Sequence, residues 1–80
     1  FIMKQVKILI NTIDKVEKFV DIISKFDNNF DMVCGKYVID AKSIMGLFCL
    51  DIREPHTLQI YESTEDNMND VLDAIQAFIV

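Results

Sequence analysis

Residues 42–50 read Lys42-Ser43-Ile44-Met45-Gly46-Leu47-Phe48-Cys49-Leu50, and the fold assignment of this 80-residue sequence depends on them. Ser43 precedes a short apolar run, the position typical of a helix N-cap, so we predict a short helix over residues 43–50. Such a helix cannot bury both of its sides. We therefore expect one side to pack inward and the other to stay exposed as a contact surface. The inward pair is Leu47 and Leu50, and the exposed set is Ser43, Ile44, Met45 and Phe48.

Alternating and helical spacings predict the elements before this stretch. Period-two alternation of apolar residues predicts a strand over residues 3–10. Helical spacing predicts a helix that begins at a cap on Asn11 or Thr12 and ends near Phe26. Two short strands, 30–34 and 37–39, are predicted to form a hairpin around the turn Gly35-Lys36.

The same rules predict the elements after it. Residues 51–56, which include Pro55, indicate a loop, and residues 57–62 indicate a strand. Ser63 or Thr64 is expected to cap a last helix with an apolar stripe. The predicted order is therefore strand, helix, strand, strand, helix, strand, helix.

Amphipathic helices and half-buried strands together favour one architecture. We predict a single domain over residues 1–80 with an α+β fold, an open-faced two-layer sandwich. Its four-stranded antiparallel sheet carries three helices on one face. The predicted core contains Phe19, Val20, Ile23, Leu58, Ile60, Val71, Leu72 and Ile75.

Composition excludes several classes of function. The net charge is −5, and nonspecific binding to nucleic acid or to an anionic membrane needs basic clusters instead. No apolar run approaches the roughly 20 residues of a membrane span, and no signal-peptide pattern is present, so we expect a cytoplasmic protein. Cys34 and Cys49 lack a metal-ligand spacing and are expected to be reduced thiols rather than a disulfide scaffold. His56 is expected to be a solvated loop histidine.

The segment Lys42–Leu50 resembles the regulatory-serine segment of HPr, the phosphocarrier protein of the bacterial sugar phosphotransferase system. The predicted element order is similar to that of HPr over nearly all of the chain. HPr proteins carry a histidine, one residue and an arginine at the start of the first helix. Alignment on Phe19-Val20 puts Thr12 and Asp14 at those two positions. The resemblance therefore implies a divergent member with a degenerate phosphocarrier site, because threonine has no imidazole nitrogen and aspartate repels phosphate.

The resemblance also implies how such a protein acts. In HPr of the Gram-positive type the serine that matches Ser43 is phosphorylated by a dedicated kinase, and the helix surface that matches Ile44, Met45 and Phe48 binds protein partners. The chain is similar to the catabolite-repression paralog of HPr, which implies no enzyme activity and no cofactor or metal. Its partner would be a transcriptional regulator, a phosphotransferase-system component or a metabolic enzyme.

Three alternatives stay open at this point. Ser43 is also explained as an ordinary helix cap, and the apolar residues beside it as packing under a loop. The chain would still be a phosphocarrier if it used a non-standard acceptor such as His56. It would also fit an unrelated small α+β interaction module.

Overall fold

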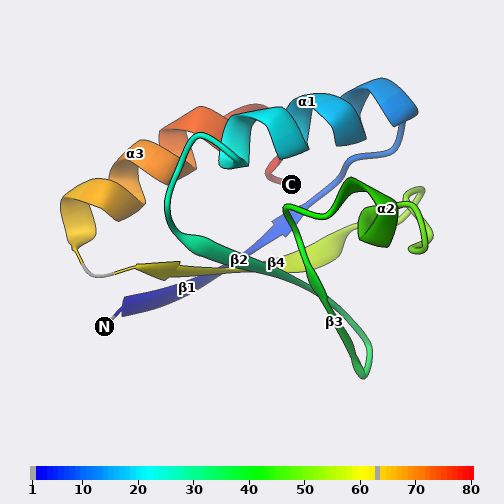
Figure 1. Cartoon of the computed structure of the whole chain (residues 1–80), viewed down its shortest axis with the longest axis horizontal. Helices are drawn as coiled ribbons and strands as arrows, with labels where there is room; N and C mark the ends of the chain where they lie inside the picture. Colours follow the sequence, from blue (N-terminus) through cyan, green and yellow to red (C-terminus); the bar gives the residue numbers. More distant parts are fainter. Residues whose placement is uncertain (1, 63) are drawn as a thin grey trace.

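Four strands form one antiparallel sheet, as the alternating patterns predict. The computed structural model describes residues 2–62 and 64–80. The strands are β1 (Ile2–Ile8), β2 (Asn29–Cys34), β3 (Tyr37–Asp40) and β4 (His56–Glu62). Their order in the sheet is β1-β4-β2-β3, and each neighbouring pair is antiparallel. β1 and β3 are the two edges, so the hairpin of β2 and β3 lies on one side of the molecule (Figure 1).

The strand register places the apolar residues on one face of this sheet. Val6 lies opposite Leu58, Leu58 opposite Met32, and Met32 opposite Ile39. Because successive side chains alternate between faces, this row belongs to the covered face of the sheet. The next row along, which includes Gln59, lies on the open face. The two-layer α+β sandwich is thereby confirmed.

Three helices cover the apolar face. They are α1 (Ile13–Ile23), α2 (Ile44–Leu47) and α3 (Glu65–Ile75), and a 3-10 turn, η1 (Gln76–Phe78), follows α3. Figure 1 shows α1 and α3 side by side over the sheet, with α2 next to the hairpin. Of the two predicted caps of α3, Thr64 accepts a hydrogen bond from the Asn67 N–H, whereas Ser63 lies outside the described residues.

Both α1 and α2 end earlier than predicted. After Ile23 the backbone bonds run from the Lys25 N–H to the Ile22 carbonyl and from the Phe26 N–H to the Ile23 carbonyl. After Leu47 the Cys49 and Leu50 N–H groups bond three residues back in the same way. Helix ends often tighten in this manner because their last carbonyls lack regular partners. The predicted eight-residue helix is therefore one α-helical turn followed by tighter turns.

The core lies between the helices and the sheet. The Phe19 ring packs edge-on against Phe78, with ring centroids 5.6 Å apart and an interplanar angle of 81°. Six of the eight predicted core residues are buried, and Val20 and Leu72 are half-buried at the margin of the core. The strand that we predicted to reach Ile10 ends at Ile8, because the Leu9 N–H bonds the Phe78 carbonyl and Ile8 pairs with Ile79. This pairing joins the end of the chain to the edge strand β1.

Candidate functional site

Ser43 is the N-cap of α2, as predicted. Its backbone is extended, with φ −88° and ψ 102°, and its Oγ accepts a hydrogen bond from the Gly46 N–H over 3.2 Å. Its carbonyl accepts the Leu47 N–H at 3.0 Å. The predicted exposure of Ser43 is wrong, because the hydroxyl turns back onto the helix and the residue is half-buried. The hydroxyl oxygen thus supports the first turn of α2.

Gly46 lets α2 approach the hairpin closely. A Cβ atom on Gly46 would lie 2.7 Å from Cγ2 of Ile39 and 3.2 Å from Oγ of Ser43. The first of these distances is shorter than any ordinary carbon contact. The lack of a side chain at this position therefore lets α2 rest directly on β3 and fixes the orientation of the helix.

This orientation turns two large apolar side chains outward. Met45 is 75% exposed and Phe48 is 40% exposed, as predicted. Ile44, which we expected beside them, instead packs against the core and is half-buried, so that prediction is wrong. Leu47 is fully buried, as predicted. A single helical turn has few residues on each of its sides. In α2, Ile44 lies on the side that packs against the core.

The first turn of α1 lies at the same end of the molecule as α2 (Figure 1). Thr12 caps α1 by accepting the Lys15 N–H at 3.1 Å, and the Asp14 carboxylate pairs with the Lys18 ammonium at 3.1 Å. Both residues are exposed, and both contacts are ordinary helix-start interactions. Neither residue provides a nitrogen nucleophile or a cation for a phosphoryl group.

Ile13 was missed by the sequence analysis. It is 64% exposed at the start of α1. Its spacing from Val16 and Val20 is that of the buried stripe, which hides its exposure at the sequence level. Only the structure shows that this first turn extends past the margin of the core. Ile13, Met45 and Phe48 are the exposed large apolar residues of α1, α2 and the turn after α2; we call them the α1/α2 surface.

The charged residues that precede Ser43 are engaged in contacts of their own. The Lys42 ammonium donates to the Phe26 carbonyl at 2.7 Å and lies 5.5 Å from the centroid of the Phe30 ring. The Asp40 carboxylate accepts the Lys42 N–H at 2.9 Å, and the Ser43 N–H donates to the Asp40 carbonyl. Lys42 therefore anchors the approach to α2 instead of presenting its charge at the serine.

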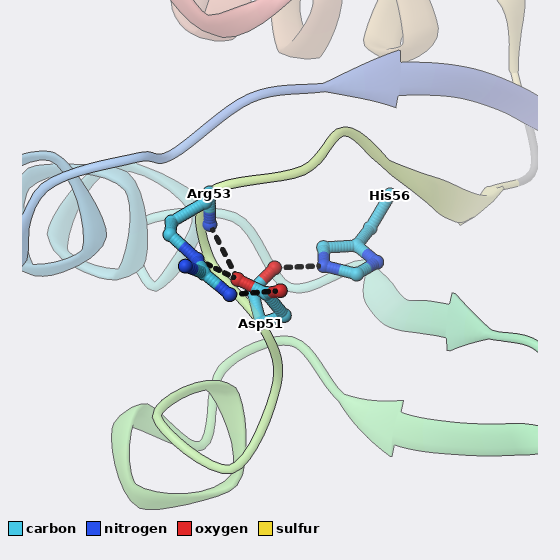
Figure 2. A network of polar contacts seen from close by, with 3 residues as sticks. All are labelled: Asp51, Arg53 and His56. Atoms are coloured by element: carbon cyan, nitrogen blue, oxygen red, sulfur yellow. Dashed lines mark hydrogen bonds and ion pairs between the residues drawn. The ribbon is translucent and has the colours of Figure 1, made fainter.

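The loop after α2 is organised around Asp51 (Figure 2). The Asp51 carboxylate accepts bonds from the Arg53 N–H and Nε at 3.1 and 2.9 Å, and from the second guanidinium nitrogen at 3.0 Å. These bonds hold the pKa of Asp51 down at about 2. The loop that the sequence predicted thus has a defined shape.

His56 belongs to the same network and corrects our prediction of a solvated histidine. It is the first residue of β4 and is only 7% exposed. Its Nε2 lies 2.7 Å from the Asp51 carbonyl oxygen, which accepts and never donates, so Nε2 carries the hydrogen (Figure 2). The buried ring therefore links the start of β4 to the beginning of the loop at Asp51.

Two further features of the described residues bear on the class of site. Among the side chains that the structure describes, no group of three or more His, Cys, Asp or Glu residues is placed to hold a metal ion. In the same described part of the chain, no helix is long and apolar enough to cross a membrane.

Comparisons with known proteins identify the family. No curated protein matches the sequence significantly. The fold is similar to that of the phosphocarrier protein HPr from Bacillus anthracis str. Ames, with 21% identity, a TM-score of 0.75 and full coverage of both chains. It is also similar to HPr-C-His from Thermoanaerobacter tengcongensis, with 23% identity, a TM-score of 0.66 and coverage of 90% of this chain and 89% of that one. A family model described as "PTS HPr component phosphorylation site" matches residues 15–80. Since this match covers most of the sequence, the chain belongs to the HPr family.

Proposed function

We propose that this protein is a non-catalytic regulatory or adaptor member of the HPr family. It binds a protein partner through α1 and α2, and phosphorylation of Ser43 by an HPr-type kinase controls that binding. The observation that carries the proposal is the α1/α2 surface, where Met45 and Phe48 stand exposed beside the cap serine. Residues 43–50 contain no charged side chain, although the chain as a whole has a net charge of −5. Absence of charge and presence of methionine and aromatic residues are typical of the centre of protein interfaces.

The start of α1 supports a role other than phosphoryl transfer. A phosphocarrier needs an imidazole nitrogen to accept the phosphoryl group and cations to hold it. Thr12 and Asp14 supply neither, and the Asp14 carboxylate repels a phosphoryl donor. His56 is a poor substitute, because it is only 7% exposed and so is poorly accessible to a phosphoryl donor. We therefore expect no transfer from phosphoenolpyruvate through Enzyme I.

This expectation has a direct test. The protein is incubated with Enzyme I and phosphoenolpyruvate, and its intact mass is measured without acid treatment, since phosphohistidine is acid-labile. The expected result is an unchanged mass for the wild type and at most a weak phospho-adduct for Thr12→His, in which Asp14 still opposes the phosphoryl group. A double variant, Thr12→His with Asp14→Arg, serves as the control that restores both groups. A phospho-adduct on the wild type would contradict the proposal.

Partner binding is tested on the α1/α2 surface itself. Wild type, Met45→Ala and Phe48→Ala are immobilised and used to capture proteins from a lysate of the source cells. Val38→Ala is the matched control, because Val38 is 61% exposed but lies in β3, outside the α1/α2 surface. We expect binding of the wild-type partner to fall at least about tenfold in Phe48→Ala, as for the anchor residue of an interface, and to stay unchanged in Val38→Ala. Equal capture by all four proteins would contradict the proposal.

Phosphorylation of Ser43 would act on binding more than on folding. A phosphate adds a charge of about −2 next to apolar side chains that carry none. The substituted oxygen can still accept the Gly46 N–H, so the cap need not be lost. We therefore expect discrimination between partners at little cost in stability.

Two variants of Ser43 distinguish the effect of a negative charge on partner binding from the effect of losing the helix cap. Ser43→Asp should change the free energy of unfolding by less than about 1 kcal/mol, because aspartate is also a good cap, while Ser43→Ala should cost about 1 kcal/mol. Partner affinity, measured by the same capture assay, should change in Ser43→Asp and stay near wild type in Ser43→Ala. An equal loss of affinity in both variants would mean that the cap matters and the charge does not.

A further inference from the structure

Cys34 and Cys49 line the same hollow. Cys34 is the last residue of β2, and Cys49 lies just after α2. The hollow has a volume of about 330 Å³, and its other lining residues are Tyr37, Ile39, Leu50 and Asp51. Both cysteines are free, so two thiols from distant parts of the sequence border one small space.

The fold explains why both cysteines border this hollow. Cys34 shares the covered side of β2 with Met32, since the two residues are two positions apart in a strand. Tyr37 lies opposite Cys34 in the hairpin, and Ile39 follows on the same face of β3. Contact of Gly46 with Ile39 holds α2 against β3 and brings the turn that contains Cys49 to this side of the hairpin.

The two thiols differ in accessibility. Cys49 is exposed, and its Sγ lies 3.5 Å from the Met45 carbonyl oxygen, a weak contact that leaves the sulfur open to reagents. Cys34 is half-buried in the lining of the hollow. An outer thiol that reacts first and an inner thiol that completes the reaction is the usual arrangement of a redox-active pair.

We propose that Cys34 and Cys49 form a redox-active dithiol that a low-molecular-weight disulfide, such as oxidised glutathione, converts to an intramolecular disulfide. The Cys49 thiolate attacks one sulfur of the oxidant, forms a mixed disulfide and releases the first glutathione thiolate, which takes up a proton. The Cys34 thiolate then attacks Cys49 Sγ, and the second glutathione leaves as a thiol. The protein loses two electrons and two protons in total, and one glutathione disulfide becomes two glutathione molecules.

The two cysteines lie on segments at the edge of the fold. β3 is an edge strand that pairs, within the described residues, with β2 alone, and a two-residue turn with Gly35 at φ +60° closes the hairpin. α2 is a single turn, followed by the tighter turns that contain Cys49. Formation of the disulfide therefore requires the hairpin tip and the turn after α2 to close over the hollow, and neither of these segments belongs to α1, α3 or β4.

The first test follows oxidation. The reduced protein is incubated with oxidised glutathione, quenched with acid, and analysed by intact mass and by counting free thiols. We expect the wild type to lose both thiols, to carry no glutathione and to stay a single chain. Cys34→Ser should retain one glutathione on Cys49, because the second step is blocked. A stable glutathione adduct on the folded wild type, or a disulfide between two chains, would overturn the proposal.

The second test measures the proximity of the reduced thiols. Phenylarsine oxide binds two thiols through one arsenic atom and is displaced easily from a single thiol. We expect one arsenic per wild-type chain that survives a wash with a monothiol, and loss of the arsenic in both Cys34→Ser and Cys49→Ser. The same loss from the wild type would overturn the proposal. Neither test involves a protein partner, so both are independent of the proposed function.

Discussion

Asp51 shows how single residues shape the end of the molecule that carries α2. Its carboxylate binds Arg53, and its carbonyl accepts the His56 ring, so one residue joins the loop to the start of β4 (Figure 2). The carboxylate is exposed to solvent, and the guanidinium holds its pKa at about 2 compared with an ordinary value of 3.8. The anion is therefore favoured in the folded state.

Replacement of Arg53 should raise the pKa of Asp51. Without the guanidinium bonds, we expect the pKa to move from about 2 toward 3.8 in Arg53→Ala, as measured by NMR titration of the Asp51 carboxyl carbon. Because the folded-state pKa is the lower one, the stabilisation is complete above about 3.8 and is lost as the pH falls through about 2. The difference in stability between wild type and Arg53→Ala should shrink over that window. Glu54→Gln is the control, and an equal shift of the pKa in that variant would contradict the assignment to Arg53.

Residue-level predictions from the sequence failed where burial was decisive. His56 stands next to Pro55 in a polar stretch, and nothing in that pattern indicates a buried ring. Its burial follows from the turn at Asp51, which depends on contacts between residues two and five positions apart. The outward direction of Met45 and Phe48 was predictable from helical spacing, whereas the inward packing of Ile44 was not. In a helix of one turn, contacts with the neighbouring core decide which side chains point inward.

At the scale of elements, the existence and type of each helix and strand followed from the sequence. Period-two alternation identified the strands, and the apolar stripes with their candidate caps, Asn11 or Thr12 and Ser63 or Thr64, identified the long helices. The ends were less predictable, because α1 and α2 finish in tighter turns whose hydrogen bonds leave no compositional signal. The seating of α2 on β3 was also not predictable, since it rests on the contact between Gly46 and Ile39.

That contact gives an element-level prediction. In Gly46→Ala the new methyl group would lie 2.7 Å from Cγ2 of Ile39, a β-branched side chain with little freedom to move. Overpacking of this kind outweighs the better helix propensity of alanine, so we expect a loss of about 1–2 kcal/mol in the free energy of unfolding, measured by urea denaturation.

A double-variant cycle assigns the loss to the contact. In an Ile39→Ala background the clash is absent, and Gly46→Ala should then be neutral or stabilising by up to about 1 kcal/mol. If Gly46→Ala costs the same in both backgrounds, the close approach of α2 to β3 is not the cause.

At the scale of the whole molecule, the acidic residues of α3 and the uncharged segment 43–50 lie on different elements. The described outer residues of α3 include exposed Asp66, Asp70 and Asp73, while residues 43–50 contain no charge. α3 begins at the opposite end of the molecule from α2 (Figure 1). The acidic first turns of α3 therefore lie away from α2, the helix that contributes Met45 to the proposed α1/α2 surface.

The core that holds these ends together is small, and its integrity depends on few residues. Phe19 is fully buried, and its edge-on contact with Phe78 joins α1 to the C-terminal turn, which in turn pairs with β1. Phe19→Ala should lower the free energy of unfolding by about 3–5 kcal/mol. That is a large part of the roughly 4–12 kcal/mol expected for 80 residues.

Phe48→Ala is the matched control for this prediction, because the same ring is removed from a partly exposed site in the α1/α2 surface. We expect its cost to stay below about 1 kcal/mol, as is usual for surface substitutions that leave no cavity. Urea denaturation of wild type and both variants measures the difference. Similar losses for the two phenylalanines would place Phe48 in the core and remove it from the proposed partner surface. A large loss for Phe19 alone would show that Phe19 maintains the fold, whereas Phe48 contributes little to stability and remains available to a partner.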